Sequence, residues 1–306
     1  MGRTMTQKQQ LRATLLGVLS ILFWSTSFAG IRSASEALGP ITTAAATQGC
    51  GGLLGLTYLA LRGELLALLR LPKLYLLGGG GLFVLSQVGA FLSVGLAANR
   101  MESIETSLVY YIWPGLILLF SIPIQKQKAR IWIIPGVIVA FFGVMTVMTA
   151  NAPDHAHQYL SGNSFIYLGA AFGACCWALY SNISRRYSET VQVNPVPLFL
   201  MVSSCSFWSL RFVLPESTIL TSQAVLEVLF MGLFPTFLAH ALWNCAMRRG
   251  NLTFLASLSY LTPFMSTFLS GLYLGVAPTS GLWVGCLLIV GGAVICKYSI
   301  YAPGQA

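Results

Sequence analysis

The 306-residue chain is 56% hydrophobic and only 8% charged, with a mean hydropathy of +0.75. A soluble domain carries about a quarter charged residues, so this composition excludes a water-soluble globular protein. The net charge of +9 is divided among short clusters between apolar runs, which excludes a nucleic-acid partner. The seven cysteines lack the spacing of metal ligands and are expected to be small buried hydrophobes. Neither a metal nor a cofactor is predicted.

Apolar runs long enough to cross a hydrocarbon core of roughly 30 Å recur along the whole chain. They are continuous rather than alternating, which predicts helices and not barrel strands, because every backbone amide in lipid must be paired. In chain order the ten predicted spans are about 11–31, 41–61, 74–97, 103–123, 131–150, 164–184, 195–214, 223–247, 252–274 and 280–298. The predicted class is an all-α polytopic membrane protein.

Lysine and arginine are divided unequally between alternate connections of these spans. Three of the 17, Arg32, Arg100 and Arg211, fall on one side of the membrane, and the other fourteen fall on the opposite side with both termini. Because basic residues are retained in the cytoplasm, this division predicts that both termini are cytoplasmic.

The two halves of the chain coincide at several positions when one is shifted along the other. At a shift of 149 residues the coincident pairs are Tyr111 and Tyr260, Pro114 and Pro263, Gly136 and Gly285, and Gly143 and Gly292. At a shift of 153 residues Trp24 coincides with Trp177. One near-constant shift across several helices predicts an internal duplication.

Each copy of this duplication contains five spans, so the second copy enters the membrane from the opposite side. We therefore predict inverted repeats at residues 1–150 and 164–306, joined by an outer loop at 151–163. Such repeats enclose a central cavity near the midplane, as in many secondary transporters that work by alternating access.

Three stretches of the sequence resemble a known family. They are LLGVLSILFWSTSFAGIRSASEALGP at 15–40, LVYYIWPGLILLF at 108–120 and GNLTFLASLSYLTPFMSTFL at 250–269. They are similar to the first, fourth and ninth helices of EamA-type members of the drug/metabolite transporter superfamily, in particular bacterial exporters of aromatic amino acids. The resemblance implies a ten-helix exporter of amino acids and related metabolites in the bacterial inner membrane. Only the resemblance gives the direction of transport.

Polar and aromatic side chains near the middle of the spans are the candidates for binding a solute, because in hydrocarbon they need a partner or water. In the first half they are Trp24, Gln48, Gln87, Tyr110 and Tyr111. In the second half they are Trp177, Tyr180, His240, Trp243, Asn244 and Tyr260. Paired rings would suit an apolar or aromatic side chain, and the amides would hold a zwitterionic head.

These candidates also have structural interpretations. Trp24 and Trp177 lie too deep for interfacial anchors, so packing is their alternative role. Gln48 and Gln87 are equally interpretable as interhelical hydrogen-bond partners. A lone helical histidine such as His240 more often satisfies a neighbouring hydroxyl or carbonyl than carries protons.

Two repeat-equivalent prolines, Pro114 and Pro263, lie inside predicted helices. Because proline removes a backbone hydrogen bond, we expect each to kink its helix. Such a kink either serves as a hinge or simply shapes the cavity.

No Asp, Glu, Lys or Arg occupies the middle of a predicted span, and only Glu105 and Glu227 come near that depth. An anion carrier would place a basic residue in its cavity, and a cation-drug antiporter a carboxylate. The leading hypothesis is therefore a secondary transporter that exports neutral and aromatic amino acids. Multidrug or aromatic-cation efflux is the alternative, since rings also bind cations.

A membrane-embedded enzyme is a hypothesis from another class, and the sequence does not favour it. His240 lacks a carboxylate to orient it, and no paired histidines or carboxylates lie elsewhere in the spans. The expected partners are a small-molecule substrate and the lipid bilayer. The sequence leaves proton coupling and the oligomeric state open, with a monomer as the simplest expectation.

Overall fold

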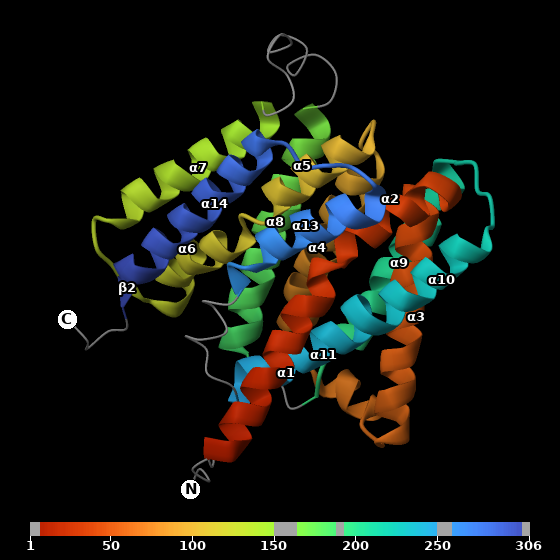
Figure 1. Ribbon diagram of the computed structural model, residues 1–306. Coiled ribbons are helices and arrows are strands. Elements are labelled where there is room, and N and C mark those ends of the chain that lie inside the picture. The colour runs from red at the N-terminus through yellow and green to blue at the C-terminus, as the bar shows by residue number, and fades with distance from the viewer. Residues whose placement is uncertain (1–6, 150–163, 188–192, 250–258, 302–306) are drawn as a thin grey trace, which may run out of the picture.

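The computed structural model describes residues 7–149, 164–187, 193–249 and 259–301 (Figure 1). The elements of the first part are α1 (Gln7–Ser25), α2 (Ser27–Leu38), α3 (Pro40–Leu61), η1 (Leu65–Arg70), η2 (Tyr75–Gly79), α4 (Gly80–Gly95), α5 (Arg100–Tyr110), α6 (Trp113–Gln125), β1 (Lys128–Ala129) and α7 (Ile133–Thr149). Those of the second part are α8 (Ser164–Arg186), α9 (Val196–Val213), α10 (Ser222–Met231), η3 (Gly232–Leu238), α11 (Ala239–Arg249), α13 (Thr262–Leu274), α14 (Ser280–Ser299) and β2 (Ile300–Tyr301). The fold is all-α apart from one pair of two-residue strands.

Seven helical stretches of the described residues are long and apolar enough to cross a membrane. They are Leu15–Leu38, Tyr75–Gly95, Arg100–Gln125, Ser164–Arg186, Val196–Val213, Ser222–Trp243 and Ser280–Ser299. Large apolar side chains cover their outer faces; Phe212 is 91% exposed and Phe165 is 77% exposed. A surface of this kind belongs in hydrocarbon, so the protein is a multi-pass membrane protein.

The first span is broken at Thr26, between α1 and α2. The backbone N–H and the hydroxyl of Thr26 both donate to the carbonyl of Phe23, at 3.1 and 2.7 Å. Beyond the break α2 continues to Leu38. The sequence prediction that ended this span near residue 31 was too short, because Arg32 pairs with Glu36 at 3.0 Å on the helix and need not leave it.

Two further breaks precede the repeat-equivalent prolines. Residues 111–112 form a turn between α5 and α6, and residues 260–261 form a turn before α13. Pro114 and Pro263 lie in the first turn of the helices that follow. Each proline is thus in the first turn of a helix that follows a break, rather than in a helix interior, and its missing N–H has no partner to lose there. Its role as a hinge or in shaping the cavity stays a prediction.

Close helix pairs hold the bundle together. α7 lies along α14, α3 along α9, α4 along α8, and α1 along α11 (Figure 1). The α7–α14 pair meets through glycines: a Cβ on Gly136 would come within 2.9 Å of the Gly292 carbonyl, and a Cβ on Gly143 within 2.9 Å of the Gly285 carbonyl. Only glycine lets two backbones approach so closely in a membrane.

A short antiparallel strand pair joins the segment before α7 to the segment after α14. Lys128 faces Tyr301, and Ala129 faces Ile300. The N–H of Arg130 adds a 2.8 Å bond to the carbonyl of Ser299. The segment that enters α7 is thus fixed to the end of α14.

The glycine contacts of α7 and α14 can be tested with neighbouring positions. In Gly292→Ala the new Cβ would lie 2.5 Å from backbone atoms of both Gly136 and Ala140. We expect this overpacking to lower the free energy of unfolding by about 1–3 kcal/mol. Gly291→Ala is the matched control, because nothing lies within 4 Å of its Cβ and alanine favours the helix.

The measurement is thermal unfolding of the purified protein in detergent. Gly292→Ala should melt at a lower temperature than the wild type, and Gly291→Ala at the same or a higher one. Equal melting temperatures of the two variants would show that the α7–α14 approach is looser than the structure has it.

Candidate functional site

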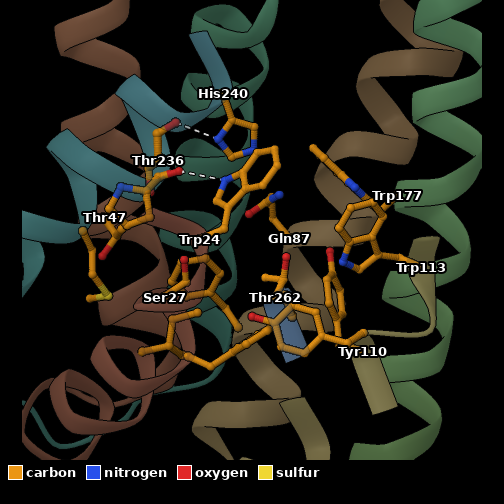
Figure 2. A pocket seen from close by; sticks show the side chains of 17 residues that line it. Trp24, Ser27, Thr47, Gln87, Tyr110, Trp113, Trp177, Thr236, His240 and Thr262 are labelled. Carbon is orange, nitrogen blue, oxygen red and sulfur yellow. Dashed lines mark hydrogen bonds between the residues drawn. The ribbon is translucent and has the colours of Figure 1, made fainter. Parts of the chain in front are cut away.

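A cavity lies deep in the bundle, between the α1–α2 break, α4, the α5–α6 break, α8, the η3–α11 junction and the start of α13 (Figure 2). Its volume, counted as the space that the centre of a water molecule can occupy, is about 90 Å³. None of its lining side chains in the described structure is charged. A larger space of about 690 Å³, between α6, α7 and α8, is almost wholly apolar and lacks the convergent polar groups of a solute site.

Aromatic rings at the middle of the cavity contact one another edge to face. The ring of Trp24 lies 6.0 Å from that of Trp177, and both pack on His240, at 5.3 and 5.6 Å between centroids. Trp113 closes the same wall at 6.5 Å from Trp177 (Figure 2). Edge-to-face rings leave ring faces free, which suits an incoming aromatic or apolar group.

Irregular backbone positions two of these rings. η3 is a π-helical turn that contains Pro235, so the backbone is irregular here. Trp24 Nε1 donates to the Pro235 carbonyl at 3.1 Å, and His240 Nδ1 lies 2.7 Å from the Thr236 carbonyl (Figure 2). A carbonyl only accepts, so Nδ1 of His240 carries the hydrogen. The histidine therefore satisfies a carbonyl, which is the structural role considered for it from sequence.

Polar groups occupy separate points of the wall. Gln48 Nε2 donates to Gln87 Oε1 at 2.8 Å; Gln48 is fully buried, whereas Gln87 lines the cavity. Thr47 and Thr262 also line the cavity, and their hydroxyl oxygens are enclosed and have no protein partner within the described part of the chain. A buried hydroxyl without a partner is costly, so each would gain from a solute or water that reaches it.

The residues selected from sequence take three kinds of position. Those that line the cavity are Trp24, Gln87, Tyr110, Tyr111, Trp177 and His240. Those that support it from behind are Gln48 through Gln87, Tyr180 through Trp177 at 5.4 Å, and Trp243 through Trp24 at 5.2 Å. Tyr260 is buried but does not line the cavity, and the side chain of Asn244 lies outside the described structure.

Cavity residues outside the sequence selection include the hydroxyl-bearing Thr47 and Thr262. A signal existed for Thr262. Trp113 and Thr262 are separated by the repeat shift of 149 residues and are the first residues of α6 and α13. Thr47 precedes Gln48 in α3 and carried no distinguishing pattern.

The many membrane-crossing helices and the uncharged cavity at their centre define a membrane transporter. Residues 164–297 match the EamA-like transporter family. The chain is 33% identical to the aromatic amino acid exporter YddG of Escherichia coli, over 93% of this chain and 96% of that protein. It is 32% identical to the protein of that name from Ancylobacter novellus, over 92% and 96% of the two chains.

A solved crystal structure has a similar fold. It matches with a TM-score of 0.71 and 30% identity, over 94% of this chain and 98% of that one. The chain belongs to the EamA-like transporter family of the drug/metabolite transporter superfamily, and it is similar to exporters of the YddG kind. It is a transporter and not an enzyme.

The bond between Gln48 and Gln87 is expected to couple α3 to α4. Gln48→Leu leaves the Gln87 oxygen without its donor, and Gln87→Leu leaves the Gln48 nitrogen without an acceptor. The double variant removes both groups, so it should be less destabilised than the sum of the single variants by about 1 kcal/mol. Thermal unfolding of the four proteins in detergent measures this coupling, and strictly additive effects would contradict it.

Proposed function

We propose that this protein exports neutral and aromatic amino acids, and related small metabolites, across the bacterial inner membrane by alternating access. The observation that carries the proposal is the composition of the cavity: aromatic rings at its middle, uncharged polar groups on its wall and no charged lining residue in the described structure. The relatives named as aromatic amino acid exporters, which match over nine tenths of the chain, give independent support.

The cavity matches an amphipathic zwitterion. The rings of Trp24, Trp113 and Trp177 provide contact area for an apolar or aromatic side chain. The Gln87 amide and the Thr262 hydroxyl can each donate and accept, so they can bind both an ammonium and a carboxylate. A solute with a net charge would be left without a counter-ion, which disfavours it.

We further propose ten membrane spans arranged as two inverted five-helix repeats, residues 1–150 and 164–306, with 151–163 as an outer loop. In this assignment α4 is in the third span, α8 is the sixth, α1 is in the first and α11 is in the eighth. Exchanging the halves converts the α4–α8 pair into the α11–α1 pair. The turns at residues 111–112 and 260–261 are also 149 residues apart.

The glycine contacts obey the same exchange. A shift of 149 residues carries Gly136 to Gly285 and Gly143 to Gly292. The contact of Gly136 with Gly292 thereby becomes the contact of Gly285 with Gly143, and both are present. Exchanging the two halves therefore maps the α7–α14 pair onto itself, as a two-fold axis in the membrane plane requires.

The orientation rests on charge. Both termini are proposed to be cytoplasmic, because that side then holds fourteen of the 17 basic residues. The three remaining arginines lie at the outer ends of the helices. One chain encloses the whole cavity, so a monomer is sufficient for transport.

An ion-pair cluster closes the outer end in the described conformation. Glu36 on α2 accepts from Arg32 at 3.0 Å and from Arg100 on α5 at 2.7 and 2.9 Å. Arg100 also donates to the carbonyl of Leu274, at the end of α13, at 2.7 Å. Since α2, α5 and α13 all border the cavity, these bonds must open before a solute can leave outward. We call these residues, Arg32, Glu36 and Arg100, the outer cluster.

Transport should depend on the paired tryptophans. In proteoliposomes, Trp24→Ala and Trp177→Ala are each expected to lower saturable uptake of radiolabelled phenylalanine by about tenfold or more, equivalent to about 1.4 kcal/mol or more of lost contact. Trp132→Ala is the matched control. Because the Trp132 side chain is 66% exposed on the surface of the molecule, this variant should keep full uptake.

The same vesicles test the alternative function, multidrug efflux. Transport of a cationic dye without transport of phenylalanine or threonine would replace amino acid export by multidrug efflux. Trp24 and Trp177 variants that transport phenylalanine as well as the Trp132 control would place the solute elsewhere.

The outer cluster should control access to the cavity. A cysteine introduced by Ile31→Cys, at a cavity position that is 3% exposed, reports on opening when an impermeant thiol reagent is added to spheroplasts. Adding Glu36→Gln should raise the labelling rate about two- to fivefold, the effect of losing exposed ion pairs of up to about 1 kcal/mol.

The matched control is Glu64→Gln, which breaks an exposed pair with Arg62 away from the cavity and should leave the rate unchanged. Background labelling is measured in the same proteins without Ile31→Cys. An unchanged rate in the Glu36→Gln protein would show that the outer cluster does not limit opening.

A further inference from the structure

A second cavity lies beside the central one, between the α1–α2 break, α10 and α13. It offers about 350 Å³ to the centre of a water molecule and is lined mainly by apolar side chains, among them Leu226, Phe230 and Leu269. Met231 borders both cavities and separates them. We call the second cavity the side pocket.

One charged residue, Glu227 of α10, lines the side pocket in the described structure, and it is 8% exposed. Its Oε1 accepts three hydrogen bonds, from Ser33 at 2.6 Å, from Gln223 at 2.9 Å and from Tyr273 at 2.6 Å. Its Oε2 accepts none from the described residues and is not among the enclosed atoms that lack a partner. This second oxygen is therefore exposed, and it belongs to a residue that lines the side pocket.

The negative charge of Glu227 has no direct counter-ion in the described part of the chain. No Lys or Arg there lies within 4 Å of its carboxylate. Arg100, which is within electrostatic range, is bonded to Glu36 instead. A carboxylate buried at membrane depth needs a cation or a complete set of donors, and here one oxygen has neither.

The surroundings select an organic cation over a metal ion. A metal would need several oxygen ligands, whereas Ser33, Gln223 and Tyr273 direct hydrogens at Oε1 and the remaining wall is apolar. An ammonium group can form an ion pair with a single carboxylate oxygen, and its hydrocarbon body gains by contacting Leu226 and Leu269.

We propose that the side pocket binds the primary ammonium group of an amphipathic molecule, with Glu227 Oε2 as its counter-ion. Two sources supply this chemistry: a soluble aromatic or alkyl amine, and the headgroup of an amine phospholipid. The second source can reach the pocket from the bilayer because Leu226, on the rim, is 66% exposed on the outer surface. The site is separate from the central cavity and does not depend on the proposed amino acid substrate.

Calorimetry on the full chain in phosphatidylcholine nanodiscs tests the proposal with phenethylamine as the probe. Saturable binding is expected, and Glu227→Gln, which keeps the shape and removes the charge, should weaken it by about tenfold or more. Phenethyl alcohol, the uncharged counterpart, should not bind. Leu269→Trp fills the pocket and leaves the carboxylate intact, so it should also weaken binding if Glu227→Gln does not fold.

Nanodiscs that contain phosphatidylethanolamine separate the two sources. A lower affinity for phenethylamine there would identify the lipid amine as an occupant, and an unchanged affinity would leave the soluble amine as the ligand. Equal binding of phenethyl alcohol, or full binding by Glu227→Gln, would overturn the proposal.

A further variant distinguishes binding in the side pocket from binding in the central cavity. Loss of phenethylamine binding in Trp177→Ala with full binding in Glu227→Gln would place the amine among the tryptophans and also overturn the side-pocket assignment. Phenylalanine uptake by the wild type is read independently, so a failure of the proposed export is distinguishable from a failure of this site.

Discussion

Hydrocarbon offers a backbone amide no water to bond, and the architecture follows from that constraint. Helix breaks can occur only where the freed groups find other partners. At Thr26 the hydroxyl and the N–H share the Phe23 carbonyl. At η3, a π-helical turn that contains a proline, two carbonyls accept hydrogen bonds from Trp24 and His240. The irregular backbone therefore holds the rings at the middle of the cavity.

The same constraint distinguishes structural polar groups from functional ones. Most hydroxyls in the bundle, such as Ser25 and Ser181, donate to a carbonyl one turn earlier in their own helix. Thr47 and Thr262 lack such bonds and line the cavity. Glu227, which lines the side pocket, likewise has one satisfied oxygen and one exposed oxygen. Among the enclosed polar atoms that lack a partner in the described structure, those of Thr47, Tyr111 and Thr262 belong to cavity residues, where a bound molecule can complete their pairing; others, such as those of Ser203 and Ser270, belong to residues that line neither cavity.

Sequence alone could place Trp24, Trp177, Gln87 and His240 at the cavity, because their depth follows from the register of the spans. It could not select Thr262, since a mid-span threonine ordinarily bonds to its own helix and only the three-dimensional contacts show otherwise. Other features depended on partners distant in sequence. In the extension of α2 beyond residue 31, Glu36 pairs with Arg32 one turn earlier and also with Arg100, across 64 residues. A proline in the sequence does not show whether the helix is kinked or interrupted there. That outcome depends on whether the carbonyls before the proline find other hydrogen-bond donors.

Divergence between the proposed repeats gives the cavity its polarity. Trp24 and Trp177, which coincide at a shift of 153 residues, keep the same ring and meet at the centre. Trp113 and Thr262, equivalent at the start of α6 and α13, do not: one copy supplies an indole and the other a hydroxyl. A symmetric cavity would accept a symmetric solute, whereas a wall of rings facing a hydroxyl favours one orientation of an amphipathic one. In the proposed arrangement, the duplication would supply alternating access, and the differences between the copies would supply recognition of a molecule with an apolar end and a polar end.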